Sequence, residues 1–369
     1  DAQLGQLGEV LFDLGSDLRP FLDLAVLSES VDTIDTAAGI LTIGLDTTYG
    51  FTPVGIAAKR AAKRGAVLVT VSTDECNLDM LSEEAVQSDP AKWPDFMEGV
   101  MKSMSGNGTR KKAASSFFKK GDRNVLVIGP DAIFSARRGE IFESALTMRD
   151  SLGWKVIVCH PYTNLMGMLA MGAFPGLKPG GMRSDGALKL KDPAAVIDVK
   201  QKWKVGYFIG EVPSPQMPGC DYIIYENALP APSGIDPDLV LPAALFTEAP
   251  GTTISCEGKI LVFNKASAPF ADSKPDWWIM SSIAERMKKG ALKYASLAAI
   301  QSEIRKSIPG FSGKDRRVPR KKVAMEGKAA AARNPHGAGR VMTPLETFRG
   351  VALHDHVAGM KAIEERRRK

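Results

Sequence analysis

The feature that most constrains this chain is a series of short, uninterrupted runs of Val, Ile and Leu at residues 40–44, 66–71, 124–129 and 155–159. Strands that are buried on both faces have such continuous apolar runs, whereas strands with one solvated face alternate. Segments with helical periodicity, 53–64 and 137–152, lie between the runs, and Pro53 and Gly65 suit the start and the end of the first helix. Repeated strand–helix–strand units predict a parallel, doubly wound α/β sheet.

A second series of apolar runs, at residues 205–210, 221–225 and 239–241, follows a loop-rich segment that contains several Pro and Gly residues. Amphipathic helices are expected after it, over 276–289 and 292–307. We therefore expect two doubly wound, Rossmann-like lobes and a separate extension. The predicted boundaries are 1–198 for the first α/β lobe, 199–311 for the second, and 312–369 for the extension.

The positive charge of the chain is concentrated in its last segment. From Lys314 to Lys369 there are 15 Lys and Arg against 6 Asp and Glu, while the remaining residues hold 33 against 36. Aromatic residues do not interleave the basic cluster at 316–322, as they often do in nucleic-acid-binding segments. We expect this basic extension to contact an acidic partner subunit or to remain solvated, with nucleic acid as the less favoured partner.

Several function classes are excluded by missing motifs. The four Cys, at 76, 159, 220 and 256, form no Cys-x-x-Cys, which excludes a disulfide framework and a Cys-based metal or cluster site within this chain. The sequence has no Gly-x-Gly-x-x-Gly, phosphate loop, His-Glu-x-x-His or Gly-x-Ser-x-Gly. We therefore assign no catalytic residue and no metal ligand, and we expect Cys76, which follows Asp74 and Glu75, to be inert.

Sparse cysteines suit a reducing compartment, and the sequence shows neither a membrane-spanning segment nor a secretory signal. We expect a cytoplasmic location or one at the periphery of a membrane complex.

An open α/β sheet binds ligands at the carboxyl ends of its strands. In this sequence, the loops that follow the predicted strands and could bind a ligand are 44–47, 72–75, 129–131 and 210–213.

Five segments of the chain occur in the order seen in one known family. Residues 171–180 read Met-Gly-Ala-Phe-Pro-Gly-Leu-Lys-Pro-Gly, and 238–248 read Asp-Leu-Val-Leu-Pro-Ala-Ala-Leu-Phe-Thr-Glu. Gly-Thr at 251–252, Glu-Gly-Lys at 257–259 and Lys-Pro-Asp-Trp-Trp-Ile at 274–279 follow. This sequence resembles formate dehydrogenases and related molybdopterin oxidoreductases over about residues 1–310. The resemblance implies two formate dehydrogenase/DMSO reductase-like lobes.

The chain departs from that family where the cofactor is held. Catalytic members have a cluster region and a Cys or selenocysteine ligand before the point that matches Ile34, yet residues 1–33 contain no Cys. The family's Asp-Pro-Arg appears as Ser-Thr-Asp at 72–74, and its Gly-x-Asn-Pro as Gly-Glu-Val-Pro at 210–213. We expect the N-terminal cluster domain and the C-terminal β-barrel to be missing as well. This pattern is most similar to the large iron–sulfur subunit of respiratory complex I.

The resemblance implies a subunit of a multi-subunit electron-transfer complex that is itself a non-catalytic scaffold and binds no cofactor. The 4Fe-4S clusters would then belong to partner segments, next to NADH- or ferredoxin-linked redox subunits. The alternative is a split catalytic module of a formate dehydrogenase-type enzyme that binds molybdopterin guanine dinucleotide with Mo or W, its metal ligand and barrel coming from partner chains. The residues that the resemblance assigns to cofactor binding are Gly44, Asp46, Asp74, Gly172, Gly210 and Glu211.

Overall fold

The computed structural model describes most of residues 18–311. Glu211, the predicted boundary at 198 and the basic extension lie outside the described residues. Among the described residues, no helix is long and apolar enough to span a bilayer. The described ranges are 18–48, 50–104, 117–119, 123–160, 163–172, 177–178, 182–183, 202–210, 219–231, 235–288, 292–308 and 311.

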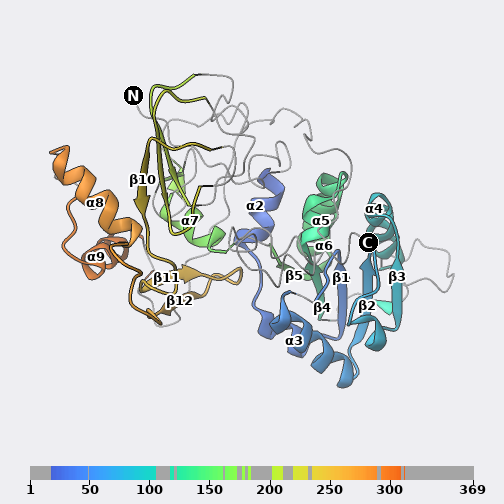
Figure 1. Ribbon diagram of the computed structural model, residues 1–369. Helices are drawn as coiled ribbons and strands as arrows, with labels where there is room; N and C mark the ends of the chain where they lie inside the picture. Colours follow the sequence, from blue (N-terminus) through green and yellow to red (C-terminus); the bar gives the residue numbers. More distant parts are fainter. Residues whose placement is uncertain are drawn as a thin grey trace.

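The first series of apolar runs forms one five-stranded sheet, with strand order β3-β2-β1-β4-β5 and every neighbouring pair parallel (Figure 1). The predicted parallel α/β sheet is therefore confirmed. The central strands β1 and β4 are buried along their whole length, which explains their uninterrupted apolar sequences. The five strands are β1 (Gly39–Ile43), β2 (Val67–Ser72), β3 (Glu84–Gln87), β4 (Asn124–Ile128) and β5 (Lys155–Val158).

Strand β3 was not expected from the sequence. It lies at the edge of the sheet and alternates half-buried and exposed residues, so its sequence, Glu-Ala-Val-Gln, has no continuous apolar run. The segment is a strand because it pairs in parallel with β2, where Val69 lies opposite Glu84.

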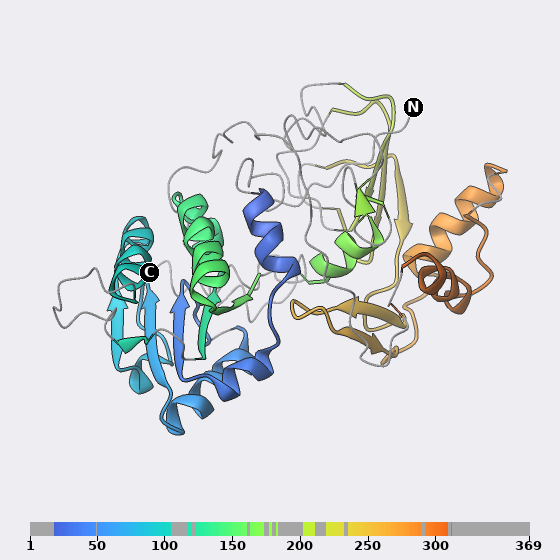
Figure 2. The same cartoon turned by 180° about the vertical axis from the view of Figure 1, so that it is seen from behind.

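Helices cover both faces of this sheet (Figure 2). One face packs against α2 (Leu18–Val26), α4 (Trp93–Met104) and α6 (Arg138–Leu152). The other packs against α3 (Thr52–Lys63) and the 3-10 helix η2 (Val31–Thr36). The short elements of this lobe are η3 (Asp79–Leu81), η4 (Pro90–Lys92), α5 (Pro130–Phe134), α7 (Leu165–Met171), β6 (Leu177–Lys178) and β7 (Met182–Arg183).

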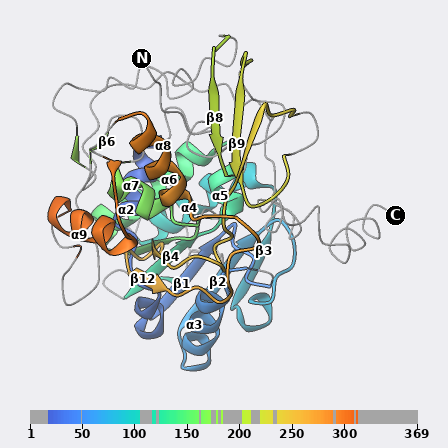
Figure 3. The same cartoon turned by 60° about the vertical axis from the view of Figure 1, so that its left-hand side comes forward.

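The second series of runs forms a separate parallel sheet in the order β10-β9-β8. Its strands are β8 (Gly206–Ile209), β9 (Ile223–Asn227) and β10 (Leu239–Pro242). Figure 3 shows β8 and β9 on the side of the first sheet opposite α3. Since residues 211–218 and 232–234 lie outside the described part, the doubly wound character of this lobe stays a prediction.

The two predicted C-terminal helices are present but shorter than expected. α8 spans Asp276–Arg286, and Lys288 beyond it adopts a positive φ of 55° that ends the helical path. α9 spans Leu297–Ser307 because Ser296 caps it, its hydroxyl accepting a bond from the Ala299 amide at 3.3 Å. Figures 1 and 2 place both helices at the end of the molecule farthest from β2 and β3.

An antiparallel hairpin of β11 (Gly251–Ile254) and β12 (Ile260–Phe263) joins the two halves of the chain. Ile254 and Ile260 are buried in the apolar core that also contains α2, α4 and α6. The Ile254 amide donates to the side-chain oxygen of Asn164 at 2.9 Å. Although this hairpin follows β10 in sequence, it therefore packs on the first lobe.

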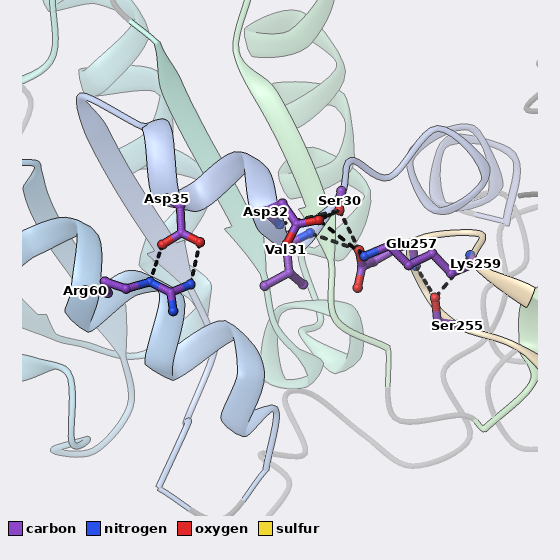
Figure 4. A network of polar contacts seen from close by, with 8 residues as sticks. All are labelled: Ser30, Val31, Asp32, Asp35, Arg60, Ser255, Glu257 and Lys259. Atoms are coloured by element: carbon purple, nitrogen blue, oxygen red, sulfur yellow. Dashed lines mark hydrogen bonds and ion pairs between the residues drawn. The ribbon is translucent and has the colours of Figure 1, made fainter. Parts of the chain in front are cut away.

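The turn of this hairpin is fastened to η2 by Glu257, as Figure 4 shows. Its Oε2 accepts bonds from the Ser30 hydroxyl at 2.7 Å and from the Val31 amide at 3.2 Å. Lys259 forms an ion pair with Glu257 at 2.9 Å and with Asp32 at 3.4 Å. Burial alone would raise the pKa of Glu257, but the bonds from Ser30, Lys259 and Val31 together hold it below 4.5.

We predict that Glu257→Gln destabilises the chain by about 1–3 kcal/mol at pH 7, because charge-assisted bonds between the lobes are lost. The lowered pKa means that the ionised group stabilises the folded chain above about pH 4.5, and that this contribution is lost as the pH falls through the folded-state pKa. The difference from wild type, measured by urea unfolding, should therefore shrink between pH 7 and pH 3.

The matched control is Glu98→Gln, which breaks an exposed i,i+4 pair with Lys102 on α4. Exposed pairs of this kind contribute little, so its unfolding midpoint should stay close to that of wild type. Equal midpoints for Glu257→Gln and Glu98→Gln at pH 7 would contradict the assignment of Glu257 as a connection between the lobes.

Candidate functional site

The carboxyl ends of β1 and β4 are where an open α/β sheet of this topology binds ligands. The chain runs outward from β1 to β2 and β3, then adds β4 and β5 on the other side of β1. The loops after β1 and β4 therefore leave in opposite directions, and ligands usually lie between them. Gly44 follows β1 and Gly129 follows β4, so the candidate site is the edge formed by the loops after β1, β2 and β4.

The backbones of Gly44 and Gly129 lie against each other at this edge. A Cβ on Gly129 would come within 2.1 Å of the Gly44 carbonyl oxygen, and one on Gly44 within 2.5 Å of the Ala132 nitrogen. Gly44 also has a φ of +62°, which glycine adopts without strain. Neither position leaves room for a side chain or for an atom of similar size.

Backbone donors at this crossover are used within the protein. Gly44 donates to the Val71 carbonyl at 2.8 Å, and Gly129 donates to the Ile43 carbonyl at 2.8 Å. The Asp131 amide, in the first turn of α5, donates to the Gly44 carbonyl at 3.2 Å. These three amides are therefore engaged by carbonyl groups of the protein itself.

The loops after β1 and β2 are tied together by Asn77. Its side-chain oxygen accepts the Thr47 hydroxyl at 2.6 Å, and its amide group donates to the Thr47 carbonyl at 3.1 Å. The Asn77 backbone amide donates to the Thr48 hydroxyl at 3.2 Å. The loops after β1 and β2 are thereby joined to each other.

Two of the predicted residues, Asp46 and Asp74, place carboxylates at the same edge. Asp46 accepts the Thr48 amide at 2.7 Å and so stabilises its own turn. Asp74 is exposed, and its carbonyl accepts the Ser72 hydroxyl at 2.7 Å. Negative side chains at both loops oppose the approach of an anionic phosphate.

Arg137, which follows β4, forms its hydrogen bonds with α6 and with the segment around α4. Arg137 donates to Glu140 at 2.6 and 2.7 Å, to Asp95 at 3.1 Å and to the Ala91 carbonyl at 2.6 Å. Its bonds to Glu140 and then to Asp95 raise the pKa of Arg137 above its usual value. The guanidinium therefore joins α6 to the segment around α4, and its charge is neutralised by two carboxylates.

The remaining predicted residues belong to other elements of the chain. Gly172 ends α7 with a φ of 72°, its amide donating to the Leu169 carbonyl at 3.1 Å. Gly210 follows β8 in the second sheet with a φ of 79° and donates to the Glu226 carbonyl at 2.9 Å. Glu211 lies outside the described residues. The structure thus places Gly44, Asp46 and Asp74 at one edge, and Gly172 and Gly210 in two other elements.

Cys76 is held in a buried, acidic environment. It is 6% exposed, and Asp79 accepts bonds from both its thiol, at 3.2 Å, and its amide, at 3.0 Å. Burial, and then the neighbouring Asp79, raise the pKa of the Cys76 thiol to about 12. This agrees with the expectation of an inert cysteine, although the responsible acid is Asp79 and not Asp74 or Glu75.

Sequence reasoning missed Asn77 and Arg137 because no motif marks either residue. Their one signal is position, since each is a polar residue in a segment that follows a buried strand. Across the described part of the chain, no group of three or more His, Cys, Asp or Glu side chains could hold a metal ion.

Comparison with known proteins points to one family. A model of the family described as molybdopterin oxidoreductase matches residues 20–286. The NADPH-Fe(3+) oxidoreductase subunit alpha of Geobacter sulfurreducens is 21% identical, covering 80% of this chain and 43% of that protein. The F420-dependent formate dehydrogenase subunit alpha of Methanocaldococcus jannaschii is 26% identical, covering 41% and 26%.

One subunit of the NADH-quinone oxidoreductase of Rickettsia bellii is 24% identical, covering 36% of this chain and 19% of that protein. The chain thus spans less than half the length of each of these curated relatives. A solved chain of the formyltransferase/hydrolase complex of Methylorubrum extorquens aligns with a TM-score of 0.49 and 16% identity, covering 78% of this chain and 91% of that chain.

We predict that Gly129→Ala destabilises the fold by about 3 kcal/mol, because the added Cβ meets the backbone of Gly44 and not a side chain that could move aside. Urea unfolding measures the change. Gly99→Ala is the control, since Gly99 lies within α4 with open space around it. That variant should gain roughly 0.5–1 kcal/mol. A Gly129→Ala chain as stable as wild type would show that the two strand ends are not in contact.

We predict that iodoacetamide alkylates Cys76 at pH 8 at least about 100-fold more slowly in the native chain than in the urea-unfolded chain, because the thiolate is the reacting form. Mass spectrometry of the Cys76 peptide over time gives both rates. Equal rates in the two states would mean that Cys76 is neither buried nor beside Asp79.

Proposed function

This chain belongs to the molybdopterin oxidoreductase family, and from that premise we propose that it is a non-catalytic scaffold subunit of a multi-subunit electron-transfer complex. In this proposal, 4Fe-4S clusters belong to other segments or chains, and the chain itself binds no pterin. The three curated relatives are each named as a subunit of an oxidoreductase or dehydrogenase, which supports membership of a complex.

One observation carries the proposal: the crossover between β1 and β4 is closed by the chain's own backbone. Gly44, Gly129 and Asp131 use their amides on carbonyls of the protein. The backbones of Gly44 and Gly129 are in contact at these strand ends, with no room for a side chain at either position. A fold that retains the lobes of the family but closes its binding edge is suited to holding neighbouring subunits in position.

In this role the two lobes act as one block, because Glu257 and the β11–β12 hairpin connect the second half of the chain to the first. We propose that the basic extension at 312–369 contacts a partner subunit, and that NADH- or ferredoxin-linked redox subunits are the neighbours. The location we propose is the cytoplasm or the cytoplasmic periphery of a membrane complex.

The alternative is a split catalytic module of a formate dehydrogenase-type enzyme. The family match, which runs through both lobes to residue 286, and the formate dehydrogenase relatives favour it. In that case a molybdenum or tungsten pterin would be held jointly with partner chains. Gly44, Asp46, Asp74, Gly172, Gly210 and Glu211 would then be the first positions of this chain to substitute.

Elemental analysis of the natively purified complex, together with pterin fluorescence after oxidation, separates the two proposals. For the scaffold we expect iron in the complex, with molybdenum, tungsten and pterin each below about 0.1 per copy of this chain. Analysis of this chain alone, carried through the same purification, is the matched control and should contain none of the three metals.

About one molybdenum or tungsten per copy of this chain, accompanied by pterin, would overturn the scaffold proposal and support the split module. Absence of iron from the complex would overturn the assignment to an electron-transfer complex.

A further inference from the structure

The hairpin of β11 and β12 carries an exposed apolar strand. Within β12, Leu261 is 48% exposed, Val262 63% and Phe263 37%, so large apolar side chains reach solvent from both faces of the strand. Ile260, at the start of β12, is buried. Single exposed apolar residues are common in proteins, but three in succession on one strand indicate a surface that another strand covers.

β12 is also an edge strand, because among the described residues it pairs with β11 alone. At the turn of the hairpin, the Ser255 amide donates to the Lys259 carbonyl at 2.9 Å. In an antiparallel ladder every second residue bonds to the partner strand, so after Lys259 these residues are Leu261 and Phe263. The backbone amide and carbonyl of Val262 therefore point away from β11.

The usual protection of an edge strand is missing from this segment. Edge strands normally carry a charged residue, a proline or a bulge that discourages pairing with another chain. Residues 260–264 read Ile-Leu-Val-Phe-Asn, and the register of β12 with β11 has no bulge. This edge is therefore suited to pairing with another strand.

An identical strand fits this edge residue for residue. In an antiparallel pair centred on Val262, the two Val262 residues exchange both of their backbone bonds, and Leu261 of one copy lies opposite Phe263 of the other. Opposed residues share a face of the sheet, so aliphatic and aromatic side chains meet across the pair. The four strands, in the order β11-β12-β12-β11, would form a sheet with twofold symmetry, which is more stable than an isolated hairpin.

The charges around β12 favour a second copy over a different protein. Different proteins recognise each other largely through complementary charges, but β12 has no charged side chain between Lys259 and Lys265. In the symmetric pair, Lys265 of one copy lies opposite Lys259 of the other. Lys259 already forms ion pairs with Glu257 at 2.9 Å and Asp32 at 3.4 Å, and these carboxylates offset the repulsion.

The exposed apolar area is sufficient for a stable contact between two copies. Phe246 is 73% exposed and Phe270 82%, and their segments meet beyond the end of β12, where the Ala266 amide donates to the Thr247 carbonyl at 2.7 Å. Aromatic side chains bury about 150–250 Å² each, so Phe246, Phe263 and Phe270 offer roughly 300–500 Å² per chain. Two copies with their aliphatic side chains added approach the ~1,200 Å² of a stable interface.

We propose that a second copy of this chain pairs with the edge of β12 and forms a symmetric dimer centred on Val262. The pairing covers Leu261, Val262 and Phe263 of both copies, and it supplies partners to the backbone groups of Val262 that point away from β11. This inference does not rest on the proposed function.

Analytical ultracentrifugation of the purified full chain, over a range of concentrations, tests the proposal. We expect twice the mass of one chain for wild type. Val262→Lys places two like charges opposite each other and should weaken association at least about 100-fold. The matched control is Ile56→Lys, which puts the same charge at an exposed apolar position of α3 and should stay dimeric.

Both positions are exposed, so both variants should keep the urea unfolding midpoint of the wild-type monomer. Val262→Pro provides a second variant, because it removes a backbone amide that points away from β11 and leaves the bonds of the hairpin in place. It should also sediment as one copy.

Val262→Cys tests the register in the natively purified complex. Across a hydrogen-bonded antiparallel pair the Cα atoms lie about 5.5 Å apart, which a disulfide can span. Mild oxidation should therefore link two copies through residue 262, as identified by mass spectrometry, whereas Ile56→Cys should form no such link.

A wild-type chain that sediments as one copy would overturn the proposal, as would a Val262→Lys chain that stays dimeric. A disulfide from Val262→Cys to a different subunit, with none between two copies, would also overturn it and assign the edge of β12 to that subunit.

Discussion

The contact between the backbones of Gly44 and Gly129 is the constraint on which the rest of the first lobe depends. It occurs where β1 and β4, two central and fully buried strands, end side by side. With no side chain at either position, α5 can begin directly over β1, and the Asp131 amide reaches the Gly44 carbonyl. The ends of these two strands are thus part of the packing of the lobe.

Two buried or partly buried acids of the chain lie in contrasting surroundings. Glu257 is surrounded by the Ser30 hydroxyl, the Val31 amide and the Lys259 ammonium, so it is stabilised as an anion. Glu226 is fully buried and accepts a bond from the Tyr207 hydroxyl, and burial raises its pKa to about 7. Acid would therefore weaken the connection that Glu257 makes between the lobes.

Prediction succeeded where burial alone decides structure and failed where long-range contacts decide it. The four apolar runs of the first lobe were recognised as strands because both faces are covered, while β3 was missed because an edge strand needs no apolar run. At the candidate site, Gly44, Asp46 and Asp74 were correctly assigned to loops that follow strands. Asn77 was missed because its bonds to Thr47 and Thr48 join residues about thirty positions apart.

The sequence by itself determined the parallel α/β architecture of the first lobe, the strands of the second, and the family, because these depend on local periodicity and on ordered motifs. The tertiary structure alone decided that the backbones of Gly44 and Gly129 meet, that the Glu257 turn packs on η2, and that Glu226 is buried beside Tyr207. The physical reason is the same in each case. These are contacts between residues far apart in the chain, and whether an amide or a carboxyl group is free or engaged depends on which partner the fold brings to it.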